Sequence, residues 1–167
     1  MGIRSELHRV HKGVDMVEML AACYNMITSE KDGLLQVLKD VRVPDGYASN
    51  ISRCVHLKEC KISGLESHDD HILMQQLVPI ALRGLLSSQV TRPLIKLSCY
   101  FHETYSKTLT VPDLENLEKD IAVTLCELEK IFPPSFFTIT VHVVMHLARE
   151  VKLGGPIHYR WMYPIER

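Results

Sequence analysis

The sequence lacks the features that mark several large classes of protein. Its 19 Lys and Arg residues are matched by 20 Asp and Glu, so no basic excess supports DNA binding, which requires clustered Lys and Arg to neutralise phosphates. It contains no run of about 20 apolar residues that would span a membrane. Its first residues do not form the apolar region of a secretion signal. We therefore expect an intracellular protein, nuclear or cytoplasmic, without a membrane partner.

The cysteines form no regular pattern, and short enzyme motifs are missing. The five cysteines are odd in number and irregularly spaced, which favours reduced thiols. Cys99 and Cys126 fall within apolar stretches, so we expect them to behave as small core residues. Phosphate-binding loops, dinucleotide fingerprints and serine-hydrolase motifs do not occur. No enzyme class is indicated by a short motif.

The sequence does contain apolar residues at helical spacing. The clearest repeat predicts a helix over residues 112–131, where leucine and isoleucine recur every three or four residues and charged residues lie between them. Weaker patterns predict further helices over residues 14–27, 30–42, 69–86, 90–107 and 134–152. We therefore predict a mainly α-helical protein of about five to six helices. An irregular N-terminal lead over residues 1–60 would contain the helix near 30–42, and residues 61–167 would form a helical domain.

Prolines interrupt two of these patterns. Pro79 lies inside the predicted helix 69–86 and should kink or split it, because proline removes one backbone hydrogen bond. Pro133 and Pro134 should begin the last helix, where a missing N–H costs little. That helix is almost continuously apolar through Val144, which predicts burial on most of its sides.

A polar stretch, His68-Asp69-Asp70-His71, precedes one of the apolar segments. Its simplest interpretation is a helix start: Ser67 lies three residues before Asp70, the spacing of a capping box. The two aspartates would also face the positive end of the helix dipole. A similar start is predicted at Ser29, with Asp32 three residues later.

The same stretch offers ligands for a metal. His68, Asp69 and His71 would be the donors. If the metal were zinc, Cys54, His56 and Cys60, which lie nearby in the sequence, could also serve as ligands. The two cysteines are separated by five residues, however, whereas common zinc pairs have two to four. Capping is therefore the favoured interpretation, and the metal site is the alternative.

A second set of potential ligands is His142, His146 and Glu150, which share one face of a predicted helix. Two histidines at this spacing can bind a metal. The catalytic version of the motif requires glutamate at position 143, where this chain has Val143. Hydrogen bonding to a neighbouring segment is therefore the favoured interpretation of this stripe.

A longer-range pattern is more specific than any single motif. An ordered series of segments closely resembles the domain of unknown function 4218, which follows the transposase core in plant CACTA (En/Spm-type) transposons. The segments are MGIRSELH (1–8), ACYNMITSEK (22–31), VLKDVRVPDGYASNISRCV (37–55), GLESHDDHILMQQLVPIALRG (64–84), TLCELEKIFPPSFF (124–137), VHVVMHLAREVKLGGP (141–156) and YRWMYPIER (159–167). The resemblance covers nearly the whole chain.

The resemblance implies part of an RNase H-like transposase, in which three carboxylates and two divalent metals, Mg or Mn, cut and join DNA. Two of those carboxylates belong to a preceding core domain, and Glu166 is the candidate for the third. The helices would be an insertion between the core and its last element, and residues 68–71 match the family's SHDxH stretch. Glu66 departs from the pattern, which usually has lysine there, and the family sequence normally continues beyond Arg167.

These implications predict a non-catalytic, transposon-derived fragment that needs no cofactor of its own. Its partner would be the transposase core domain or another nuclear protein, and an uncovered apolar surface would favour self-association. Two alternatives remain open. One is a domesticated nuclear module that binds proteins through its helices. The other is a metal-binding, DNA-processing module that uses Glu166 and the His/Asp cluster.

Overall fold

The computed structural model describes residues 9–11, 17–19, 22–42, 51–137 and 139–157. The described chain is mainly helical, as predicted from the sequence. Its helices are α1 (Thr28–Asp40), α2 (Ile51–Cys54), α3 (Ser67–Ile72), α4 (Val78–Ala81), α5 (Ser88–Thr104), α6 (Val111–Glu129) and α7 (Ile139–Gly154). A π-helical turn, η3 (Leu73–Leu77), joins α3 to α4, and 3-10 turns lie at η2 (Leu57–Glu59) and η4 (Pro134–Phe136).

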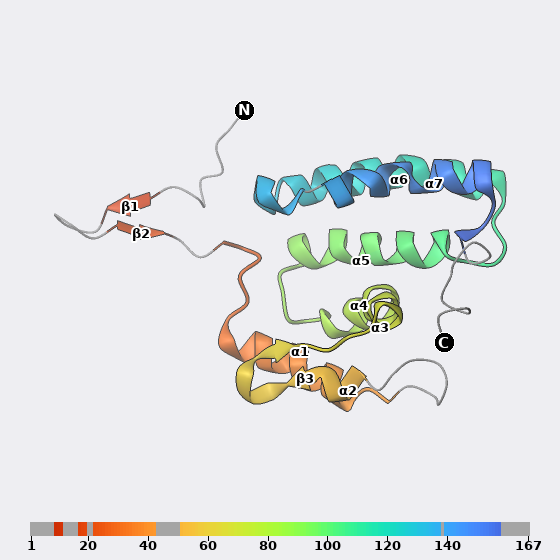
Figure 1. Ribbon diagram of the computed structural model, residues 1–167. Helices are drawn as coiled ribbons and strands as arrows, with labels where there is room; N and C mark the ends of the chain where they lie inside the picture. Colours follow the sequence, from red (N-terminus) through yellow and green to blue (C-terminus); the bar gives the residue numbers. More distant parts are fainter. Residues whose placement is uncertain (1–8, 12–16, 20–21, 43–50, 138, 158–167) are drawn as a thin grey trace.

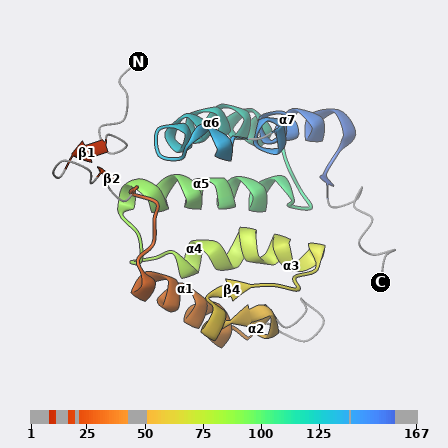
Figure 2. The same cartoon turned by 60° about the vertical axis from the view of Figure 1, so that its left-hand side comes forward.

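The helices are stacked in layers around α5 (Figure 1). Helices α6 and α7 lie side by side on one face of α5, and α3 with α4 lies on the other. Beyond α3 and α4 lie α1 and α2, and Figure 2 shows the same order from a second direction. None of the helices in the described part of the chain combines the length and apolar content needed to cross a membrane.

Within the described residues, four short strands form two antiparallel pairs. Strand β1 (Arg9–His11) pairs with β2 (Val17–Met19), and β3 (Val55–His56) pairs with β4 (Lys61–Ile62). The prediction of a helix over 14–27 was therefore wrong, since β2 lies within that range. A helix of this length is marginal in water unless it buries an apolar face.

The core consists of two hydrophobic clusters on opposite sides of α5. The C-terminal core joins α5, α6 and α7 through Tyr100, Leu114, Leu117, Ile121, Leu125, Leu128, Ala148 and Val151. The N-terminal core joins α1, α2, β3 and the α3–η3–α4 segment through Leu35, Leu38, Ile51, Val55, Ile72, Leu77 and Ala81. The face of α6 predicted to be buried is buried, because helical periodicity is a local property of the sequence.

The first turn of α6 is held by a capping box that the sequence analysis did not anticipate. The Thr110 Oγ1 accepts a hydrogen bond from the Asp113 N–H at 3.4 Å. The Asp113 carboxylate in turn accepts one from the Thr110 N–H at 3.2 Å. Two exposed backbone donors are thereby satisfied, which explains why the helix begins at Val111.

The end of the chain departs from the prediction in two ways. Pro134 begins the 3-10 turn η4, and α7 begins only at Ile139. Helix α7 is not buried on most sides: Val143 is 53% exposed and Leu153 is 77% exposed. Helix α7 packs against α5 and α6, and neither Val143 nor Leu153 is among the residues of that packed cluster.

The expectation for two cysteines was also wrong. Cys99 and Cys126 are both exposed. Each is next to buried residues in sequence, such as Tyr100 and Leu125, but successive residues of a helix are 100° apart. An apolar stretch therefore does not place each of its members in the core.

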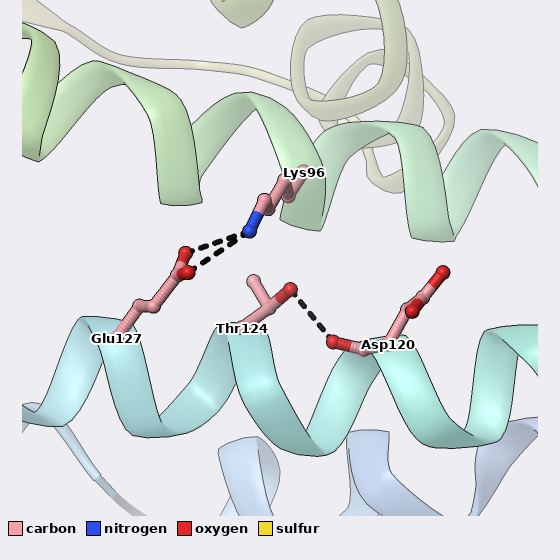
Figure 3. Close-up of polar contacts among 4 residues, drawn as sticks. All are labelled: Lys96, Asp120, Thr124 and Glu127. Atoms are coloured by element: carbon pink, nitrogen blue, oxygen red, sulfur yellow. Dashed lines mark hydrogen bonds and ion pairs between the residues drawn. The ribbon is translucent and has the colours of Figure 1, made fainter.

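Two lysine–glutamate pairs connect the three C-terminal helices. Lys96 of α5 donates to both carboxylate oxygens of Glu127 of α6, at 2.9 and 3.0 Å (Figure 3). One turn earlier on α6, the buried Thr124 hydroxyl donates to the Asp120 carbonyl at 2.8 Å. The second pair connects α7 to α6, where Lys152 donates to Glu118 at 2.9 Å.

The ion pair between Lys96 and Glu127 should have a measurable effect on the titration of Glu127. Hydrogen bonding from Lys96 holds the pKa of the Glu127 carboxyl below its ordinary value. The stabilisation is therefore present above the ordinary glutamate pKa and is lost as the pH falls through the lowered one. We expect Lys96→Met to raise the pKa of Glu127 in an NMR titration of side-chain carboxyl carbons. Replacing Lys119, an exposed lysine on α6, the helix that carries Glu127, should leave the pKa of Glu127 unchanged. An unshifted pKa of Glu127 in Lys96→Met would contradict the prediction.

Candidate functional site

The polar stretch before the apolar segment forms the start of α3. The Asp69 carboxylate accepts a hydrogen bond from the Glu66 N–H at 3.2 Å, and Asp69 is fully buried. The capping interpretation is therefore correct in kind, but the pair is Glu66 and Asp69 rather than Ser67 and Asp70. Asp70 is exposed, as a first-turn carboxylate facing water can be.

Helix α1 is displaced in the same direction, by two residues rather than one. It begins at Thr28, and the Glu30 carboxylate accepts from the Ile27 N–H at 2.8 Å. The predicted pair was Ser29 and Asp32. In both helices an acidic residue in the first turn binds a free backbone donor. The sequence showed that such a start exists but did not identify its register.

His71 connects this start to the end of α5. Its ring meets the Tyr105 ring edge-on, with centroids 5.0 Å apart. Its Nδ1 lies 3.4 Å from Gln75 Nε2, one turn further along the same helical segment. Tyr105 is the C-cap residue of α5, so the histidine lies at the contact between α3 and the C-terminal end of α5.

The π turn that follows is explained by Pro79. The Val78 N–H donates to the Leu73 carbonyl, five residues earlier. If this pairing continued, the Met74 carbonyl would need an N–H from Pro79, which proline lacks. Instead, the hydroxyl of buried Ser98 on α5 donates to the Met74 carbonyl at 2.7 Å. The expected interruption at Pro79 thus takes the form of a π turn whose free carbonyl is bound by α5.

Ser98 and Tyr105 are the residues of this junction that the sequence analysis missed. The available signal was Pro79 inside a helical pattern, since a buried carbonyl without its usual donor needs another one. The pattern did not say which helix would supply that donor. The junction attaches the start of α3 and the π turn to α5. Its two contacts are the edge-on contact between the rings of His71 and Tyr105 and the hydrogen bond from Ser98 to the Met74 carbonyl.

Several of the predicted metal ligands contact groups outside the predicted ligand set. His68 lies in α3, and its side chain is outside the described residues; Asp69 is bound to the Glu66 N–H, and His71 contacts Tyr105. The Cys54 thiol lies 3.2 Å from the Gly64 carbonyl, and the Cys60 thiol lies 3.6 Å from Asp32. Within the described part of the chain, no three His, Cys, Asp or Glu side chains are gathered as a metal site would require. A metal site at His68, Asp69 and His71 stays a prediction.

The remaining candidates lie on α7 and beyond it. His146 and Glu150 are both exposed on α7, whereas the His142 side chain is outside the described residues. Glu166, the candidate third carboxylate, also lies outside them.

Comparison with known proteins gives a family match. Residues 104–167 match the family described as Domain of unknown function (DUF4218). The match extends from the last residue of α5 through α6, η4 and α7 to the end of the sequence. It supports the resemblance to a domain of unknown function over this C-terminal part. No curated protein and no solved structure matches the chain.

Proposed function

We propose that this chain is a non-catalytic, transposon-derived helical domain that packs against the nuclease core of a CACTA-type DNA transposase. The family match over residues 104–167 supports the likeness to the domain that follows such cores. The observation that carries the docking role is the outward surface of the matched helices. Apolar side chains there face solvent, at Val111, Val123, Val143, Met145 and Leu153.

An apolar surface of this kind favours a protein partner over free solvent. Val143 and Leu153 lie on the side of α7 that faces away from the C-terminal core, so neither contributes to that core. Contiguous exposed apolar surface is typical of protein–protein interaction sites. The near balance of charge does not favour DNA as the partner of this surface.

The chemistry of two-metal nucleases supports a non-catalytic role for these residues. The attacking and leaving oxygens are stabilised by two cations held among several carboxylates around one phosphate. The resemblance assigns only Glu166 of that set to this sequence. One carboxylate cannot hold both cations in the required geometry.

A cleavage assay tests the non-catalytic role directly. We expect the purified chain, with Mg²⁺ or Mn²⁺, to leave a duplex DNA substrate intact, and Glu166→Gln to behave in the same way. Titration with duplex DNA should show weak binding with little dependence on salt. Metal-dependent cleavage that is lost in Glu166→Gln would overturn the proposal in favour of an enzyme.

A second assay tests the docking surface. Without its partner, the chain should self-associate in a concentration series followed by sedimentation velocity, because the apolar surface is uncovered. The double variant Val143→Gln, Leu153→Gln should remain closer to monomeric. Ile80→Gln is the matched control, since Ile80 is 58% exposed but lies on α4, outside the matched residues. Equal association of all three proteins would argue against a docking surface on α7.

A further inference from the structure

The outward side of α7 carries four exposed residues at the spacing of a coiled-coil seam. Coiled-coil seams repeat at alternating intervals of three and four residues. Val143, His146, Glu150 and Leu153 follow this spacing, and all four are exposed. Residues so spaced lie along one stripe of a helix. This stripe is called the α7 seam below.

The opposite side of α7 faces the C-terminal core. Ala148 has no exposed surface, Val151 is 2% exposed, and Val144 packs against the same core. Helix α7 lies with α6 in the layer farthest from α1 (Figure 1). The two apolar residues of the α7 seam take no part in the core and are available to a helix from another molecule.

We propose that the α7 seam binds the α7 seam of a second copy of this chain, with the two helices antiparallel about a two-fold axis near Ala148. In this arrangement each residue faces one that lies equally far along the sequence on the other side of Ala148. Val143 then faces the partner's Leu153, and His146 faces the partner's Glu150. The inference concerns the same side of α7 as the proposed docking surface, but it does not rest on a transposon origin.

Charge complementarity selects the antiparallel orientation. Each His146 imidazole meets a carboxylate of the other copy, and the two-fold axis generates this pair twice. In a parallel arrangement the two Glu150 carboxylates would face each other and repel. The contacts between Val143 and the partner's Leu153 lie at both ends of the polar pairs. Polar residues in such a seam lower affinity but specify register and orientation.

His146 also interacts with a charge inside its own chain. Lys152 lowers the pKa of the Glu118 carboxyl on α6, and Arg149 and His146 add smaller effects in the same direction. Lys152 donates to Glu118 at 2.9 Å and is its main partner. Facing a carboxylate of a second copy would therefore leave the principal contact of Glu118 in place.

Exchanging the charges of the α7 seam in the full chain tests the pairing by sedimentation equilibrium. We expect Glu150→Lys and His146→Glu each to weaken dimerisation by about fivefold or more, because each removes two symmetric attractions. The double variant His146→Glu, Glu150→Lys should dimerise within about twofold of wild type, since opposite charges face each other again. A parallel dimer would show no such rescue, because like charges would still face each other.

Glu115→Lys is the matched control for the change in net charge. Glu115 is exposed on α6, outside the α7 seam, so its replacement should leave dimerisation unchanged. Circular dichroism of each variant would show whether the helical fold is retained, which separates weakened association from unfolding.

Two results would overturn the pairing. One is a wild-type chain that stays monomeric across the concentration series. The other is association of equal strength in wild type, both single variants and the double variant, which would show apolar contact without an antiparallel register. The charge variants retain Val143 and Leu153, so the second result would leave the apolar docking surface intact. The cleavage assay of the proposed function does not depend on the α7 seam, and the two proposals can therefore fail separately.

Discussion

Replacing Leu128 with alanine is expected to lower the free energy of unfolding by about 2–5 kcal/mol. Leu128 has no exposed surface and lies in the C-terminal core, where α6 packs against α5 and α7. Alanine removes apolar contacts and leaves a cavity that the surrounding helices can fill only in part. Urea denaturation followed by circular dichroism would measure the change.

Leu153→Ala is the matched control for this prediction. It makes the same chemical change at a leucine of α7 that is 77% exposed. A surface substitution of this kind usually changes stability by less than about 0.5 kcal/mol. Similar losses for the two variants would mean that Leu128 does not contribute to a packed core as the structure places it.

Tyr100→Phe should lower the free energy of unfolding by about 1–3 kcal/mol, because a buried donor and a buried acceptor lose their shared partner. The Tyr100 hydroxyl donates to the Val144 carbonyl at 2.8 Å and accepts from the Ala148 N–H at 3.2 Å. These two groups are four residues apart in α7, so in a regular helix they would pair with each other. The phenol of α5 therefore bridges the backbone ladder of α7.

The same hydroxyl predicts a loss of stability in alkali. Burial raises the pKa of Tyr100 to about 12 from its ordinary value of 10.0, although the hydrogen bond from Ala148 opposes part of that rise. The unfolded chain therefore releases this proton at a lower pH than the folded chain does, and stability falls as the pH rises from about 10 toward 12.

The Tyr100→Phe variant separates the effect of Tyr100 ionisation from the effects of other groups that titrate in the same pH range. The difference in stability between wild type and Tyr100→Phe should shrink as the pH rises through that interval. Tyr24→Phe is the control, because its ring stacks on Phe132 while the substitution preserves the ring. A difference that stays constant from pH 8 to pH 12 would contradict the assigned role of the Tyr100 hydroxyl.

Part of the candidate site could be predicted from the sequence, and part could not. The acidic residues before the apolar segment indicated a helix start, because capping depends on residues three or four positions apart. The register was displaced by one residue: Asp69, not Asp70, binds the backbone. The roles of Ser98 and Tyr105 depend on how α5 lies against the π turn, and no local pattern in the sequence specifies that packing.

The local sequence was sufficient to specify helices α1, α5 and α6 and, for α6, the side that is buried. Helical periodicity depends on neighbours within two turns of chain, and these sequences carry it clearly. For α7 the apolar run was too continuous to reveal which residues would face water.

Tertiary packing determines which helices are in contact and which polar side chains form hydrogen bonds between them. The Tyr100 bridge to α7, the Ser98 bond to the π turn and the stacking of Tyr24 on Phe132 each join residues far apart in the chain. Periodicity says that a face is apolar but not what covers it. The pairing of faces depends on the shape of the whole packed chain, and for this reason these contacts appear only when the helices are assembled.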